Sequence, residues 1–182
     1  MLTLNETNIE KTILRYENGI ASLHAAFSDL TKEEFDSTPI PNTWTPRFLL
    51  AHLVDFEAII TSRLKLIIAT KNPLILGCDE SNFAERLNYA NRSIQLGLDL
   101  YKLIRIEMLT VMKPLVESDW NRNCVHNEIG RMNLWEYFLV ACAHSEHHLH
   151  YMDSKRKAWG KIELGIQLPQ EYPPTWIMKN EN

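Results

Sequence analysis

One stretch of sequence decides the fold of this chain: NLWEYFLVACAHSEHHLHYMDSKRK, residues 133–157. Within it, one set of side chains recurs at spacings of three, four and seven residues, which places the set on one face of a helix. The members of this set are Leu134, Phe138, Ala141, His148 and Met152. The pattern predicts an amphipathic helix from about residue 133 to about residue 157.

The same helical spacing appears three more times along the chain. The first helix is expected from about residue 7 to about 30, and the second from Pro46 until the pattern fades at Lys71. The third is expected to be long, from about 82 to about 117, with Pro114 kinking or ending it. No β-strand pattern is found, and residues 118–130 are expected to form a loop.

Two threonines have the sequence context of helix N-caps. Thr31 is followed three residues later by Glu34, which is the form of a capping box. Thr45 precedes Pro46, and proline is well tolerated at the first helical position because its missing N–H is not needed there.

Four amphipathic helices of this length bury their apolar faces most simply by packing together. The sequence therefore predicts an all-α fold, a four-helix bundle over residues 1–160, followed by an irregular C-terminal tail over residues 161–182. From Leu168 the tail carries the prolines of an extended segment, which is expected to pack on the surface or on a neighbour.

Composition excludes several classes of protein. The chain is 45% hydrophobic and 23% charged with a net charge of −4, so it can form a core but lacks the basic surface that binds nucleic acid. The longest apolar run, residues 137–143, is too short to span a membrane. The N-terminus does not resemble a signal peptide, and three widely spaced cysteines are expected to be reduced thiols of a cytoplasmic protein.

Histidine placement is the most informative chemical feature. His144, His147, His148 and His150 fall in one seven-residue window. His144 and His148 are four residues apart, so on a helix their rings lie about 6 Å apart on one face and could bind one divalent ion. His147 is a weaker competitor for the second position, and His150 points elsewhere by helical geometry.

His52 is the third candidate ligand, because it lies inside the apolar stripe of the second helix. Two interpretations are open: a core histidine satisfied by a hydrogen bond, or a ligand that meets the pair on the fourth helix. Ala141 would leave room beside such an ion, and Tyr137 and Tyr151 would flank it. Asp55 is a candidate acceptor for an imidazole N–H. A helix carboxylate at such a position is, however, more commonly exposed to solvent.

The remaining motifs carry little functional signal. His24 is expected at the surface or an interface, and His126 in a solvated loop. The chain contains no HExxH, no Glu-x-x-His, no Gly-x-Ser-x-Gly and no glycine-rich nucleotide loop. Three tryptophans are expected to be packing anchors near the joints of loops and helices: Trp44, Trp120 and Trp135.

Taken together, these motifs resemble the DinB/YfiT-like superfamily, in order and spacing from about residue 5 to about 160. The matching segments are Trp44-Thr-Pro continuing to His52-Leu-Val-Asp, His126 to Glu136 with Gly130-Arg-Met-Asn-Leu, His144-Ser-Glu-His-His, and Lys155-Arg-Lys-Ala-Trp-Gly. The resemblance implies an up-up-down-down bundle, often a homodimer. It also implies a divalent metal, zinc or nickel, held at the positions of His52, His144 and His148. The tail after Gly160 has no counterpart in the family's pattern.

Members of this superfamily differ in activity, so the resemblance leaves several functions open. The leading hypothesis is a metal-dependent enzyme acting on a small molecule, either as a hydrolase or as an S-transferase that uses an external low-molecular-weight thiol. Asp55 and Glu146 are candidate general bases by proximity only, and no catalytic residue is assigned. The alternatives are a stress-related protein that binds a metal or ligand without turnover, and a helical dimer whose histidines only fill the core.

Overall fold

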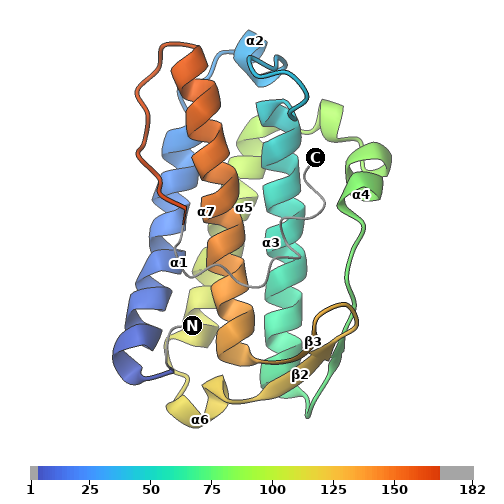
Figure 1. Ribbon diagram of the computed structural model, residues 1–182, viewed down its shortest axis with the longest axis vertical. Helices are drawn as coiled ribbons and strands as arrows, with labels where there is room; N and C mark the ends of the chain where they lie inside the picture. The colour runs from blue at the N-terminus through green and yellow to red at the C-terminus, as the bar shows by residue number, and fades with distance from the viewer. Residues whose placement is uncertain (1–3, 169–182) are drawn as a thin grey trace.

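The computed structural model of the chain describes residues 4–168, and four long helices form the body of the molecule (Figure 1). They are α1 (Glu6–Phe27), α3 (Pro46–Ala69), α5 (Ile94–Met112) and α7 (Leu134–Ala158). Each long helix packs against two others, so that α1 and α3 lie diagonally opposite, as do α5 and α7. The expected four-helix bundle is therefore confirmed.

The helix directions correct one expectation. In Figure 1, α1 and α7 run upward while α3 and α5 run downward, so the order along the chain is up, down, down, up. The expected up-up-down-down order holds around the bundle, in the sequence α7, α1, α5, α3, but not along the chain. The reason is the connection between α3 and α5, which returns along the whole length of the bundle so that these two helices are parallel neighbours.

Polar caps set where the helices begin. The side chain of Thr45 accepts a hydrogen bond from the N–H of Phe48, with Pro46 at the first helical position, as expected. Thr31 and Glu34 form the expected capping box at α2 (Lys32–Phe35). A further capping box, between Asn133 and Glu136, starts α7.

The long third helix expected over residues 82–117 is wrong. The structure has α4 (Glu80–Arg86), a 3-10 turn η1 (Tyr89–Asn91) and then α5. Asn88 breaks the helix because its backbone is left-handed, with φ of 56°, and Ser93 starts α5 by capping the N–H of Leu96. The helix does end just before Pro114, as expected, because proline has no N–H to continue the helical hydrogen bonds.

The structure also contains a small sheet where none was expected. β1 (Leu74–Ile75) pairs in parallel with β2 (Asn123–His126), which pairs antiparallel with β3 (Gly130–Asn133). The predicted loop 118–130 thus holds β2 and the turn, and α6 (Glu117–Trp120) overlaps its start. Strands of two to four residues are too short to show the alternation by which a strand is recognised in sequence.

Buried apolar side chains form two core clusters, one in each half of the bundle. Trp120 and Trp135 are buried at the lower end, where they pack edge to face and anchor the joints of α6 and α7, as expected. The first tail residues return along α7, and the carboxylate of Asp153 accepts hydrogen bonds from the N–H groups of Leu164 and Ile166. The rest of the expected extended tail, from residue 169, lies outside the described residues.

Residue 160 as the boundary between bundle and tail remains a prediction. Within residues 4–168, no helix combines the length and the apolar character that a membrane span requires.

Candidate metal centre

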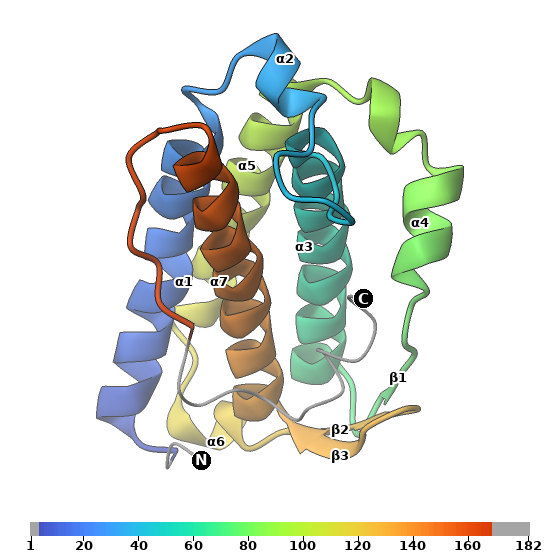
Figure 2. The same cartoon turned by 45° about the horizontal axis from the view of Figure 1, so that its top comes forward.

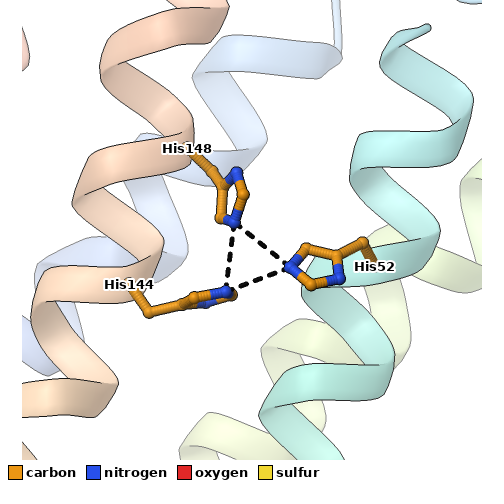
Figure 3. Close-up of side chains that lie close together, drawn as sticks. All are labelled: His52, His144 and His148. Atoms are coloured by element: carbon orange, nitrogen blue, oxygen red, sulfur yellow. Dashed lines mark hydrogen bonds between the residues drawn. The ribbon is translucent and has the colours of Figure 1, made fainter. Parts of the chain in front are cut away.

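Three imidazole rings from two helices converge at one point between α3 and α7 (Figure 3). The Nε2 atom of His52 lies 3.0 Å from that of His144 and 3.1 Å from that of His148. The Nε2 atoms of His144 and His148 are also 3.1 Å apart. The three candidate ligands predicted from the sequence are therefore brought together, and we call them the histidine triad.

The helices and two aromatic rings fix these orientations. His144 and His148 stand one turn apart on α7, and His52 faces them from the second turn of the antiparallel helix α3. The ring of Phe56 stacks on His144 with centroids 3.5 Å apart, and Trp44 packs edge-on against His52 at 5.2 Å. The imidazoles of His52 and His144 are thus held in place by packing as well as by their helices.

Burial keeps the triad neutral. Burial lowers the pKa of His52 to about 4. It also lowers the pKa values of His144 and His148 well below the usual range, and the neighbouring histidines add to the effect. Neutral imidazoles carry the free nitrogen lone pairs that a metal ion needs.

Hydrogen bonding alone cannot satisfy this arrangement. A neutral imidazole nitrogen is either a donor or an acceptor, so among three nitrogens in mutual contact at least one pair must be alike. A cation between them would satisfy all three lone pairs. A tetrahedral zinc ion with bonds of about 2.0–2.1 Å separates its ligand nitrogens by roughly 3.3 Å, close to the observed spacing. The residues present therefore fit a divalent metal ion.

Comparison with known proteins agrees with this geometry. The sequence profile of the DinB superfamily matches residues 15–152 of the chain. This chain belongs to the DinB superfamily. That result confirms the resemblance seen in the sequence.

Relatives of this DinB-superfamily protein carry a common description. A protein of Oceanobacillus iheyensis is 32% identical over 133 residues, covering 72% of this chain and 77% of its own. One of Bacillus licheniformis is 26% identical over 160 residues, covering 87% and 91%. Both are named "putative metal-dependent hydrolase". The fold matches YfiT from Bacillus subtilis, with a TM-score of 0.83, 20% identity and coverage of 89% and 93%; that structure is described as a probable metal-dependent hydrolase with an unusual four-helix bundle topology.

The other histidines of the DinB-superfamily chain lie outside the triad. His147 is buried and packs its ring against His148 and Tyr151. The Nδ1 atom of His150 bonds the carbonyl oxygen of Ile166 at 2.7 Å, and His24 is exposed on α1, as expected. The expected solvated position of His126 is wrong: it is buried in β2, where its Nδ1 accepts from the N–H of Glu128.

The two candidate bases are engaged elsewhere. Asp55 accepts a hydrogen bond from Arg92 at 2.5 Å instead of from an imidazole, and Glu146 accepts hydrogen bonds from Nε and Nη2 of Arg15 on α1. Over residues 4–168, no carboxylate joins the triad as a fourth metal-ligand candidate. One or more coordination positions would therefore remain open, as in catalytic zinc sites.

The predicted neighbours of the site are only partly correct. Ala141 is buried one turn before His144. The hydroxyl of Tyr137 instead accepts from Arg63 at 3.1 Å, and Tyr151 is largely exposed beside His147. Phe56, Trp44 and His147 have rings that pack against the triad, and Trp44 thus has a role beyond that of a packing anchor.

A buried charged network that was not predicted from the sequence joins all four long helices. Arg105 on α5 donates to Glu57 on α3 at 2.9 Å, to Ser145 on α7 at 2.5 Å and to the carbonyl oxygen of Tyr16 on α1 at 2.9 Å. The hydroxyl of Tyr16 also donates to Glu57. Ser145 directly follows His144, so the network fixes the helix segment that carries the triad. Glu57 and Arg105 lie inside the apolar stripes of the expected second and third helices. This placement of two charged residues is the sequence signal that could have revealed the ion pair.

Proposed function

We propose that this protein is a metal-dependent hydrolase of small molecules, with one divalent ion held by His52, His144 and His148. The observation that carries the proposal is the triad: three neutral, buried imidazole nitrogens at mutual distances of 3.0–3.1 Å, with no carboxylate among residues 4–168 to complete the ligand set. The names of the relatives support the hydrolase reaction, and the chemistry of the donor set supports zinc or nickel.

Bound there, such an ion would polarise a carbonyl or phosphoryl group and activate water for attack on it. The chain's own contribution is to hold three lone pairs in a fixed arrangement before the ion arrives. Phe56 and Trp44 restrict the rings and limit the access of solvent, since both contact the triad directly.

An S-transferase using an external thiol is the alternative chemistry. Any thiol would have to come from outside, because none of the three cysteines belongs to the triad ligand set, and burial raises the pKa of each of them. A panel of ester, amide and phosphoester substrates, assayed with and without a low-molecular-weight thiol, separates the two reactions. The homodimer and the cytoplasmic location remain predictions.

Metal stoichiometry tests the site directly. Protein purified without a histidine tag should contain about one zinc, nickel or similar ion per chain by elemental mass spectrometry. His52→Ala and His148→Ala should lose that ion while keeping helical circular dichroism, since each removes one of three ligands. His24→Ala is the matched control, because this histidine is exposed on α1. Wild-type protein that takes up no zinc, nickel or manganese after reconstitution would contradict the proposal.

A further inference from the structure

Lys155 is a buried lysine of α7 for which the described chain offers no counter-charge. It is only 3% exposed, and its ammonium group donates a hydrogen bond to the hydroxyl of Thr43. Residues 4–168 place no carboxylate within ion-pair distance of it. Arg105 and Arg156, which are buried as deeply, differ in this respect: Arg105 pairs with Glu57, and Arg156 pairs with Asp29.

A buried charge with one neutral partner is costly to the fold. Removing an ammonium group from water disfavours its charged form, and a hydroxyl oxygen offsets only part of that loss. Accordingly, burial lowers the pKa of Lys155. A residue kept in such a position at the expense of stability is a candidate for a functional role.

The helix register places Lys155 above the histidine triad. It follows His148 by seven residues, which is nearly two full turns, so it lies on the same face of α7 about 10 Å farther along. Long side chains on a helix lean toward its N-terminus, which here is the direction of His148.

The partner of Lys155 leads to the triad by a second route. Thr43 precedes Trp44, and the ring of Trp44 packs against His52 with centroids 5.2 Å apart. The loop before α3 therefore touches both the ammonium group and a triad imidazole. Lys155 and the triad are thus linked twice, once along α7 and once through this loop.

We propose that Lys155 binds an anionic group, a carboxylate or a phosphate, of the substrate whose reacting bond lies at the triad. The substrate class is then a small anionic ester or amide. The missing counter-charge is supplied by the substrate, which also restores favourable surroundings for the ammonium group. This inference rests on the proposed function, because the triad is taken as the reaction centre.

Dicarboxylates test the distance between the two binding points. Zinc-loaded protein is titrated by calorimetry with succinate, glutarate and adipate, and with the monomethyl ester of each. One of the three diacids should bind about tenfold or more tightly than its monoester, because only the diacid offers a second carboxylate for Lys155. A phosphonocarboxylate of the same length shows whether phosphate or carboxylate is preferred.

Variants show whether Lys155 causes this preference. Lys155→Met should abolish the difference between diacid and monoester, and Lys155→Arg should keep part of it. Lys157→Met is the control, since that lysine is two residues away and its side chain is 71% exposed. Lys155→Met should also unfold at the same or a higher temperature than the wild type, because it removes an uncompensated buried charge. A purely structural lysine would instead lower that temperature.

Two measurements separate this inference from the proposed function. The metal content of every sample is determined, so a wild type without metal contradicts the hydrolase proposal. The same anions are then tested on metal-free protein by their protection of Lys155 from acetylation, with Lys157 as internal control. An equal diacid preference in Lys155→Met, or equal labelling of Lys155 with and without anions in metal-free protein, would overturn the inference.

Discussion

Glu57 and Arg105 lie at the centre of the bundle, where neither is more than 3% exposed. The rings of Tyr16 and Tyr101 face the guanidinium group from 4.2 and 4.5 Å. Burial opposes the charge of Arg105, but Glu57 and the two tyrosines raise its pKa above the usual value. Burial and Glu57 also raise the pKa of Tyr16, so its hydroxyl remains a donor. The charge of Arg105 therefore depends on Glu57, and the hydrogen bond from Tyr16 depends on Glu57 as well.

Replacing one member of the Glu57–Arg105 pair should destabilise the fold far more than replacing both members with apolar residues. Glu57→Leu and Arg105→Met should each lower the free energy of unfolding by about 3–5 kcal/mol, because each leaves one uncompensated charge in the core. The double variant should cost clearly less than the sum. Chemical denaturation of the four proteins measures the coupling, and Glu57→Gln controls for the shape of the side chain. Additive losses would show that the two residues act independently.

At this scale the sequence allowed some predictions and not others. The four-residue spacing of His144 and His148 follows from the geometry of one helix, so their proximity could be predicted. That His52 meets them depends on how two distant helices pack, and there the sequence left two interpretations open. The Glu57–Arg105 pair and the burial of Lys155 depend on the same packing and were missed.

Asn88 lies between α4 and the 3-10 turn η1, in the segment that connects α3 to α5, which we call the crossover. Its φ of 56° is a conformation that glycine and asparagine adopt far more readily than alanine. Asn88→Ala should therefore lower the free energy of unfolding by about 1 kcal/mol, whereas Asn88→Gly should be close to neutral. Asn91→Ala is the control for the hydrogen bond that Asn91 donates to Asn88. Thermal unfolding of the three variants gives the order of their stabilities. Equal effects of Ala and Gly at position 88 would contradict the explanation.

The crossover also shows why one element was predicted incorrectly. Leu87 and Ala90 continue the apolar spacing of α5, so periodicity alone joined them to one helix. The left-handed backbone at Asn88 and the cap at Ser93 interrupt it, and Leu87 is 40% exposed. The caps at Thr31 and Thr45, by contrast, were predicted correctly, because capping depends on residues only three positions apart.

At the scale of the whole molecule, the triad joins two helices, and its members His52 and His144 are 92 residues apart in sequence. An ion that binds only the folded protein adds to its stability by mass action. Zinc at a hundred times its dissociation constant should raise the unfolding temperature by roughly 5–10 °C. His52→Ala should show no such rise at that concentration. Differential scanning calorimetry with and without a chelator measures both, and an equal rise in the variant would mean that zinc binds elsewhere.

The arrangement of the helices has a consequence for how the protein is made. Helix α1 packs against α5 and α7 but lies diagonally across from α3, the next long helix in the chain. A nascent chain that has released only α1 and α3 from the ribosome therefore has no partner for either apolar face. The bundle can close, and the three triad histidines can meet, only after α7 has been synthesised. Until then the exposed faces are suitable binding sites for chaperones, and the proposed metal ion can bind only after α7 has been made.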